Sequence, residues 1–457
     1  MIADRTMTAA RAHSFGPIIL FVVLLLGLGG TPPAGAVDIE RVRTPGGLEA
    51  WLVQDHTNPI ITFRFTFRGG SSGDPVGKEG LAEMTASLLD EGAGDLDAEA
   101  FHARLEEGSF SIGFDAGRDT IGGSLRTLRR NHVEAFDLLR LALTRPRFDA
   151  EAIERVRNQI LVGLLRAEED PGSIAYKVMA KTFYPDHPYG RPSNGTRETV
   201  QGLVRDDFLD VVRRLMARDN LVIGVVGDTT PDEIARLIDK TFDGLPEKAV
   251  PPQVVVVPPK ASGDTVVVRK AVPQSTILFA HDGLMREDPD FYAAFVLNHI
   301  LGGGSFSSRL YAEVREKRGL AYSIHSGLYP SRNSAMWMGS AGTANARVGE
   351  TVRLVREEWR RLAADGVTVE ELRNAKDYLT GSYPLQFTSS GRIASALVNL
   401  QLDNLGIDYI GKRNSLIEGV TLDDLKRVAA RLLRPDLLTF FVVGEPQGLT
   451  ESKEVGQ

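Results

Sequence analysis

The chain has 457 residues, about three times the usual length of one domain, so two or more domains are expected. Hydrophobic residues make up 42% and charged residues 25%, the balance of a folded globular protein rather than of a disordered chain or a coiled coil. The net charge of −7 does not favour binding to nucleic acid, whose phosphates require concentrated lysine and arginine. The absence of cysteine excludes disulfides, thiolate zinc sites and cysteine nucleophiles.

The first 36 residues have the pattern of a secretory signal peptide. Arg5 and Arg11 give a positive start, residues 18–28 form an almost unbroken apolar run, and a small-x-small sequence at 34–36 offers a cleavage site. The apolar run is short for a membrane helix, which needs roughly 20 residues. We therefore expect a periplasmic or secreted protein. An uncleaved N-terminal membrane anchor is the alternative, and membrane association is expected only in that case.

The rest of the chain combines strand-like runs with amphipathic helices. Residues 60–67 and 265–269 are rich in β-branched and apolar side chains, as expected of strands. Residues 132–143 and 292–300 carry apolar side chains at the spacing of helices that are buried on one face. Strands and helices mixed in this way in both halves favour an α+β fold with helices layered on one face of a sheet.

A proline-rich stretch divides the chain in two. Residues 248–262 contain two proline pairs, which favour an extended spacer. On either side, residues 218–228 and 435–445 share the pattern of a turn, an apolar strand and a closing glycine, which indicates a duplicated domain. The predicted division is a signal peptide at 1–36, an N-terminal domain at 37–247, a linker at 248–262, a C-terminal domain at 263–450 and a tail at 451–457.

A helix is predicted to follow the Gly-Leu-Ala sequence at residues 80–82, because its apolar residues between Leu81 and Leu89 form one stripe. Glu83 and Ser87 then lie one turn apart on another face. This segment resembles the pitrilysin (insulinase and mitochondrial-processing-peptidase) family of zinc peptidases. In active members the helix carries His-x-x-Glu-His directly after Gly-Leu-Ala, where the two histidines bind zinc and the glutamate activates the metal-bound water.

The sequence departs from this motif at each functional position. Glu83 and Ser87 stand where the family has histidines, and Ala86 stands in place of the general base. The third zinc ligand of the family is a glutamate eight residues before a proline, and counting back from Pro171 reaches Gly163. The resemblance therefore implies that the zinc site has been lost and that this chain holds no cofactor.

Other side chains offer no replacement for the zinc ligands. The eight histidines, no two of which share a helix turn, are His13, His56, His102, His132, His187, His281, His299 and His325. A structural role is the better interpretation of His187, which lies in a proline-containing loop. A hard cation held by Glu83, Asp90 and Glu91 is an alternative, but three acids on an exposed helix are more often a solvated face. We predict no metal.

The second half contains a glycine-rich sequence before a helix. Residues 301–310 read Leu-Gly-Gly-Gly-Ser-Phe-Ser-Ser-Arg-Leu, but no Gly-Lys-Ser/Thr follows, so a flexible loop is a better interpretation than a nucleotide-binding loop. We expect a helix over 307–317, capped by serine and ended by Gly319, and then a strand over 321–328. Arg309 is expected to be a structural anchor.

Arg315 and Tyr322 are expected to converge from the end of this helix and the start of this strand. The glycine-rich sequence and the Gly-Leu-Ala-Tyr at 319–322 resemble the same family. There, an arginine and a tyrosine at this spacing bind the substrate backbone and stabilise the oxyanion at the scissile carbonyl, a role suited to a guanidinium and a phenol. The alternative is a surface Arg315 paired with Glu313 or Glu316 and a Tyr322 buried in the core.

The resemblance covers nearly all of the chain after the signal peptide and implies two duplicated domains, each a mostly antiparallel sheet with helices packed on one face. In paired bacterial members of the family, one subunit brings the zinc and the other brings the arginine and the tyrosine. This chain looks like the second kind. The resemblance thus implies a heterodimer in which a zinc-bearing homologous subunit cleaves an extended peptide and Arg315 and Tyr322 act in the partner's site, with this chain inactive alone.

Two further interpretations stay open at this point. The chain could be a structural or peptide-binding homologue with no role in proteolysis, resembling the core proteins of respiratory complexes. It could also be an autonomous peptidase with new ligands, which stoichiometric zinc in the isolated protein would reveal.

Overall fold

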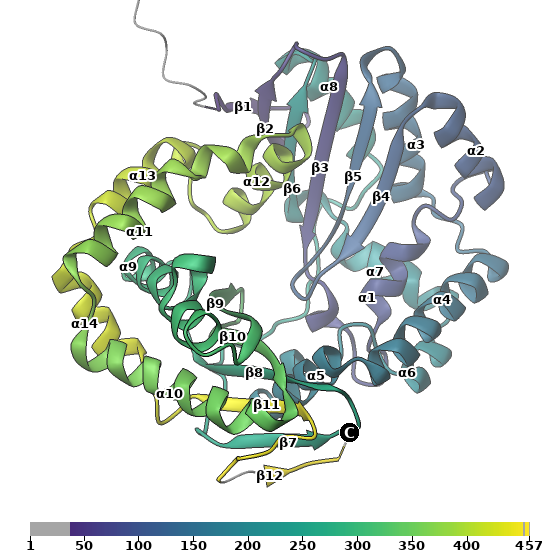
Figure 1. The fold of residues 1–457 in the computed structure, drawn as a ribbon. Coiled ribbons are helices and arrows are strands. Elements are labelled where there is room, and N and C mark those ends of the chain that lie inside the picture. Colours follow the sequence, from purple (N-terminus) through teal and green to yellow (C-terminus); the bar gives the residue numbers. More distant parts are fainter. Residues whose placement is uncertain (1–36, 451–452, 457) are drawn as a thin grey trace, which may run out of the picture. The chain divides into compact units, whose positions relative to one another are not determined.

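The computed structural model describes residues 37–450 and 453–456, so the signal peptide predicted at 1–36 lies outside the described residues. The described part contains two six-stranded sheets, one from each half of the sequence (Figure 1). The strands of the first sheet are β1 (Glu40–Arg43), β2 (Glu49–Gln54), β3 (Ile60–Arg68), β4 (Ser111–Ala116), β5 (Thr120–Leu128) and β6 (Leu221–Gly227). Those of the second are β7 (Thr265–Arg269), β8 (Gln274–Asp282), β9 (Ala321–Ser331), β10 (Ser334–Ala344), β11 (Thr439–Gly444) and β12 (Lys453–Glu454).

Helices follow the strands in both halves, and none of those described is long and apolar enough to cross a membrane. The α-helices of the first half are α1 (Leu81–Leu88), α2 (Ala98–Gly108), α3 (His132–Thr144), α4 (Ala150–Glu169), α5 (Pro171–Phe183), α6 (Arg197–Gly202), α7 (Arg205–Leu215) and α8 (Pro231–Phe242). Those of the second half are α9 (Phe291–Asn298), α10 (Val348–Asp365), α11 (Val369–Gly381), α12 (Ser390–Leu402), α13 (Tyr409–Glu418) and α14 (Leu422–Leu432). Two π-helical segments lie at His299–Gly303 and Tyr311–Glu316.

The two sheets share the topology of five of their six strands, and they differ at one edge, where β1 runs antiparallel to β2 but β12 runs parallel to β7. Their strand orders are β1-β2-β6-β3-β5-β4 and β12-β7-β11-β8-β10-β9. In each sheet one inner strand, β6 or β11, runs parallel to one neighbour and antiparallel to the other. Gly227 and Gly444 end these strands with φ of 142° and 150°, a backbone conformation open to glycine. The shared topology confirms the α+β fold of two mostly antiparallel sheets. Residues 248–262 form neither helix nor strand.

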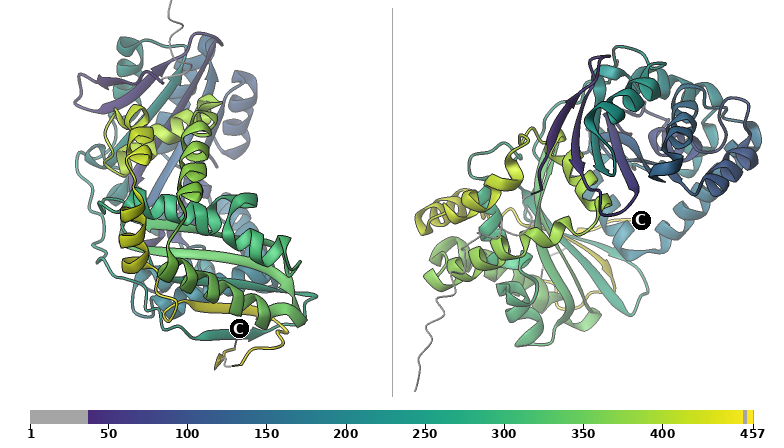
Figure 2. Two further views of the ribbon diagram at one scale, coloured as in Figure 1. Left: turned by 60° about the vertical axis from the view of Figure 1, so that its left-hand side comes forward. Right: turned by 90° about the horizontal axis from the view of Figure 1, so that it is seen from above.

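Successive side chains of a strand point to opposite faces of its sheet. In both sheets, apolar side chains lie on both faces. Leu52 of β2 packs with the helices of its own half, whereas Trp51 and Val53 lie on the other face. That other face is covered by α12 of the second half (Figures 1 and 2). Leu397 of α12 is fully buried there. Gln401 of α12 also donates a hydrogen bond of 2.9 Å to a backbone carbonyl of β6.

The second sheet receives a helix from the first half in the same way. Phe441 and Val443 of β11 contact apolar side chains of α5, among them Met179 and Ile174. The two halves therefore exchange one helix each, so that α12 completes the first sheet and α5 completes the second. The amphipathic spacing of the sequence predicted helices on one face of each sheet, and the exchange accounts for the apolar side chains on the other face.

Gly224 of β6 lies at the closest approach between α12 and the first sheet. A Cβ added there would lie 2.7 Å from the carbonyl oxygen of Ala394 and 3.0 Å from the Cβ of Leu397. We expect Gly224→Ala to lower the free energy of unfolding by about 1–3 kcal/mol, because backbone and helix must separate to admit the methyl group. Chemical denaturation of the purified protein measures this change.

Gly113→Ala in β4 is the matched control, since a Cβ added there meets no atom within 4 Å. It should change the free energy of unfolding by no more than about 0.5 kcal/mol. Equal stability of the two variants would show that α12 does not press on β6 as described.

His281 of β8 is the fully buried histidine of the second core. Its Nε2 accepts a 2.9 Å hydrogen bond from the indole of Trp359, and its Nδ1 donates to the carbonyl of Asp282 at 2.6 Å. Burial lowers the pKa of His281, with the carboxylate of Asp282 opposing this and Arg434 adding to it. The folded protein therefore keeps this imidazole neutral in a pH range in which the same imidazole is protonated in the unfolded chain.

Stability should fall as the pH drops below about 6.5, the pKa of an unperturbed histidine, because only the unfolded chain then gains a proton. We expect the melting temperature of the wild type to decline more steeply between pH 7 and pH 5 than that of His281→Gln. His325→Gln, at an exposed histidine of β9, should retain the slope of the wild type. The same slope in all three proteins would contradict this assignment.

Candidate functional site

Helix α1 carries Glu83, Ala86 and Ser87, which stand where the pitrilysin family has its zinc-binding motif. It begins after Gly80, whose φ of 91° is left-handed, and it buries Leu81 and Leu88 as the sequence predicts. The carboxylate of Asp74 accepts hydrogen bonds of 3.0 Å from the backbone N–H groups of Gly80 and Ala82. Burial raises the pKa of Asp74 to about 7, against these hydrogen bonds. Asp74 thus fixes the start of α1 from outside the usual capping position, so no spacing rule could have identified it.

The side chains at the family's ligand positions do not fit zinc. Glu83 is half-buried, and its pKa is raised first by burial and then by the charge of Asp115. Ser87 lies one turn after Glu83 on α1, and Ala86 is buried between these two residues. None of the three side chains is an imidazole. Gly163 on α4 contributes no side chain. One carboxyl and one hydroxyl group are a poor donor set for zinc, which prefers imidazole, thiolate and carboxylate ligands together.

One of the neighbouring acids is engaged in a structural contact. Glu91 forms an ion pair with Arg155, and its carboxylate lies 3.8 Å from Nε2 of His102. Burial raises the pKa of Asp90. Within residues 37–450 and 453–456, no group of three or more histidine, aspartate or glutamate side chains is placed to hold a metal ion.

His187 is held by two hydrogen bonds. Its Nε2 donates to the carbonyl of Val255 at 2.9 Å, and its Nδ1 accepts from the backbone N–H of Tyr189 at 3.1 Å. Val255 belongs to the stretch predicted as a linker, so the imidazole fastens that stretch to the loop before the turn at Pro188–Gly190. Both ring nitrogens are used, which agrees with a structural role.

Arg315 and Tyr322 are brought together by the structure. The guanidinium carbon of Arg315 lies 4.8 Å from the centre of the Tyr322 ring and 4.9 Å from the centre of the Tyr311 ring. Arg315 comes from the π-helical segment Tyr311–Glu316 and Tyr322 from the start of β9. Stacking of a guanidinium on aromatic faces orders the arginine without consuming its hydrogen-bond donors.

The surroundings contradict the alternative of an ion-paired arginine and a core tyrosine. Tyr322 is 78% exposed. Glu313 is engaged by Lys317 and by Arg318, the latter pair at 2.6 Å. In the part of the chain that the structure describes, no carboxylate lies within ion-pair distance of Arg315, which is half-buried beside the exposed Tyr322.

The helix predicted over 307–317 differs in detail from the structure. The chain first makes a 3-10 turn at Ser305–Ser307 and then winds as a π-helix from Tyr311. The capping serine is Ser308, which is buried and accepts from the backbone N–H of Tyr311 at 3.4 Å. Gly319 ends the segment with a φ of 59°, as predicted. Spacing rules assume α-helical hydrogen bonds, so they could not place the wider π turn.

Two aromatic residues missed by the sequence reasoning extend the Arg315–Tyr322 pair. Phe306 is 73% exposed, and its ring meets that of Tyr311 edge-on with 5.0 Å between centres. Phe306, Tyr311, Arg315 and Tyr322 thus form a row of flat and cationic side chains, which we call the aromatic row. Such a surface can hold an extended peptide backbone by stacking and hydrogen bonds.

Arg309 ties the start of this segment to α11. Its Nε and Nη2 donate to the two carboxylate oxygens of Glu371 at 2.6 and 2.8 Å, and Nη2 also donates to the carbonyl of Gly366 at 3.0 Å. A two-point arginine–carboxylate pair is directional as well as strong. Arg309 therefore anchors the helix that carries Arg315.

Comparison with known proteins places this architecture in a family. The family model described as the peptidase M16 inactive domain matches residues 202–379. The non-peptidase homolog YmxG of Helicobacter pylori is 28% identical over 370 residues, covering 80% of this chain and 84% of that protein. An uncharacterized zinc protease of Streptomyces coelicolor is 27% identical over 421 residues, covering 88% of this chain and 89% of that protein.

A solved structure agrees with these relatives. The crystal structure of a peptidase M16 inactive domain from Pseudomonas fluorescens matches with a TM-score of 0.83 and 27% identity, covering 91% of this chain and all of that chain. The family model, the relatives and the solved structure together support an inactive member of the M16, or pitrilysin-type, peptidase family, in which Glu83, Ala86 and Ser87 stand in place of the zinc-binding motif.

Proposed function

We propose that this chain is the non-zinc subunit of a heterodimeric M16-type metallopeptidase. It would supply Arg315 and Tyr322 to the active site of a homologous subunit that carries His-x-x-Glu-His. The observation that carries this proposal is the stack of the half-buried Arg315 on the exposed Tyr322, in which Arg315 lacks a carboxylate partner in the described part of the chain.

The chemistry of the pair suits the stabilisation of negative charge. The guanidinium and the phenol are donors that can reach a peptide carbonyl and the oxyanion that develops from it. Because the guanidinium carbon of Arg315 lies 4.9 and 4.8 Å from the ring centres of Tyr311 and Tyr322, the cation is ordered before the substrate arrives. Donors that are oriented in advance contribute most in the transition state, where the charge is largest.

The proposal places the complex outside the cytoplasm. The positive start, the apolar run at 18–28 and the small residues at 34–36 support export to the periplasm or beyond. An extended peptide is the substrate class that the aromatic row fits, and a zinc-bearing homologue is the partner that would provide the hydrolytic centre.

Reconstitution tests the proposal directly. This chain and a zinc-bearing homologue from the same cells are purified separately, and cleavage of unstructured peptides is measured for each and for an equimolar mixture. We expect cleavage by the mixture to exceed the sum of the separate activities by tenfold or more, with no zinc-dependent cleavage by this chain alone. Equal activity of the homologue with and without this chain would overturn the proposal.

A second candidate is a peptide-binding protein with no part in proteolysis. The relative from Helicobacter pylori is named a non-peptidase homolog, and the aromatic row, with Phe306 and Tyr322 exposed, could hold a peptide without cleaving it. The two candidates differ in what Arg315→Ala does. In the accessory subunit it lowers cleavage by the mixture, whereas in a binding protein it weakens peptide binding and leaves the cleavage by any zinc-bearing homologue unchanged.

A further inference from the structure

A cavity of about 670 Å³ lies apart from the aromatic row, between α9, α12, α13 and the turn Tyr383–Phe387. Its walls are mainly aromatic and apolar side chains, and three arginines line it: Arg286, Arg392 and Arg413. This volume falls within the range of small-molecule sites in proteins. The charges in the cavity indicate what it binds.

Arg286 is stacked within a group of aromatic rings. Its guanidinium carbon lies 4.0 Å from the centre of the Phe291 ring. Its Nη2 donates to the phenol oxygens of Tyr292 and Tyr409 at 3.2 and 2.9 Å. The remaining donors of this guanidinium have no hydrogen-bond acceptor among the described residues.

Arg413 is the more buried of the arginines, at 6% exposure. Its guanidinium carbon lies 4.3 Å from the centre of the Tyr383 ring, and its Nη1 donates to the carbonyl of Leu379 at 2.6 Å. Arg392 is exposed at the rim. Across the described ranges, no carboxylate lies within ion-pair distance of Arg286, Arg392 or Arg413. A buried guanidinium without a counter-charge is costly unless a ligand supplies the charge.

Asp403 is the single acidic residue among those that line the cavity. Burial raises its pKa, with Arg286 opposing the rise and Glu287 adding to it. The lining therefore holds three cationic side chains against one carboxyl group, in a chain whose net charge is −7.

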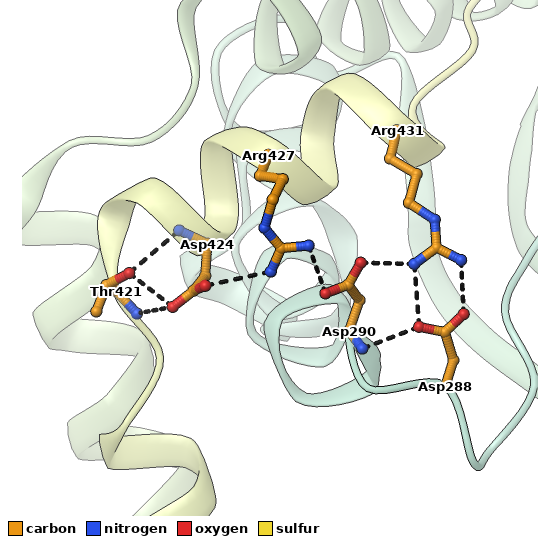
Figure 3. A network of polar contacts seen from close by, with 6 residues as sticks. All are labelled: Asp288, Asp290, Thr421, Asp424, Arg427 and Arg431. Atoms are coloured by element: carbon orange, nitrogen blue, oxygen red, sulfur yellow. Dashed lines mark hydrogen bonds and ion pairs between the residues drawn. The ribbon is translucent and has the colours of Figure 1, made fainter.

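Two aspartates close to Arg286 in sequence, Asp288 and Asp290, form ion pairs with arginines of α14. Figure 3 shows Asp288 bound by Arg431 of α14, and Asp290 bound by both Arg431 and Arg427. These contacts hold α14 against the start of α9 and keep both aspartates from pairing with Arg286. The cavity thus retains its positive charge although acidic residues lie close by in the chain.

We propose that this cavity binds a carboxylate group attached to an aromatic or other apolar residue. The guanidinium groups of Arg286 and Arg413 would hold the carboxylate, and the rings of Phe291, Tyr383 and Tyr409 would contact the apolar part. Two sources have this chemistry, the C-terminal residue of a peptide and a free small aromatic acid. The inference goes beyond the proposed subunit function and does not depend on it.

Calorimetric titration of the whole protein tests the proposal with N-acetylphenylalanine and with its amide, which lacks the charge. We expect the acid to bind at least tenfold more tightly than the amide. The tripeptide Ala-Ala-Phe distinguishes the sources: tighter binding than N-acetylphenylalanine supports a peptide C-terminus, and equal or weaker binding supports a free acid. Equal affinity for acid and amide, or no binding of either at millimolar concentration, would overturn the proposal.

Matched variants locate the binding. Arg286→Gln should weaken binding of N-acetylphenylalanine at least tenfold, and Arg413→Gln should do the same if circular dichroism shows it folded. Arg373→Gln, which removes an exposed arginine of α11 outside the cavity, should leave the affinity unchanged. An unchanged affinity in Arg286→Gln, or an equal loss in Arg373→Gln, would contradict the assignment.

Discussion

Tyr322→Phe should lower the turnover number of the reconstituted heterodimer by about tenfold or more, as expected for loss of one oxyanion donor. The substitution keeps the ring that stacks on Arg315 at 4.8 Å and removes only the phenol oxygen. Because Tyr322 is 78% exposed, the fold should be unaffected. The loss should appear in kcat more than in KM if the phenol acts mainly in the transition state.

Tyr329→Phe is the matched control, since Tyr329 is also a partly exposed tyrosine of β9, at 39%. Its turnover number should equal that of the wild type. Arg315→Ala should cost more than Tyr322→Phe, because it removes several donors and the charge together. Wild-type turnover in both Tyr322→Phe and Arg315→Ala would rule out the role proposed for the pair.

Restoring the four family residues should convert a chain without a zinc site into one that holds about one zinc ion. The required changes are Glu83→His, Ala86→Glu, Ser87→His and Gly163→Glu. The first three place two imidazoles one turn apart on α1, with a carboxylate between them. The fourth adds a ligand on α4, where a Cβ at position 163 meets no atom within 4 Å. Elemental analysis of the purified variant measures the zinc content.

The control for the fourth ligand is the triple variant that retains Gly163. With two imidazoles and no third protein ligand, it should lose its zinc to a weak chelator that leaves the quadruple variant loaded. If the quadruple variant keeps its fold but binds no zinc, then α1 and α4 are no longer positioned as in the zinc peptidases. The zinc site would then be absent because the backbone has changed, and not only because the motif residues have been replaced.

The fold class was predictable because it rests on local periodicity. The alternating apolar residues of β3 and the three- and four-residue spacing of α3 are set by neighbours in the sequence. The repeated strand that ends in Gly227 and in Gly444 identified the duplication, and the structure gives both copies the same parallel and antiparallel neighbours. The helix end and the strand start on either side of Gly319 gave the expectation that Arg315 and Tyr322 converge, and the resemblance to the zinc peptidases added a role for the pair.

Contacts between residues far apart in the sequence were not predictable. Nothing in the spacing of α12 showed that Leu397 packs on the first sheet rather than on the second. Asp74 caps α1 from a preceding turn, and the π-helical geometry around Arg315 breaks the rules used to place caps. The cation-rich cavity depends on which arginines Asp288 and Asp290 bind, and only the folded arrangement of α14 decides that.

The helix exchange also has a consequence for the time course of synthesis. The last strand of the first sheet ends at Gly227, but the helix that covers its second face is complete only at Leu402. At roughly 5–20 residues per second, a ribosome needs about ten to thirty seconds to make the intervening chain. Throughout that interval Trp51, Val53 and Val226 would be exposed to solvent. The nascent protein therefore presents an aggregation-prone apolar surface, which chaperones are suited to bind.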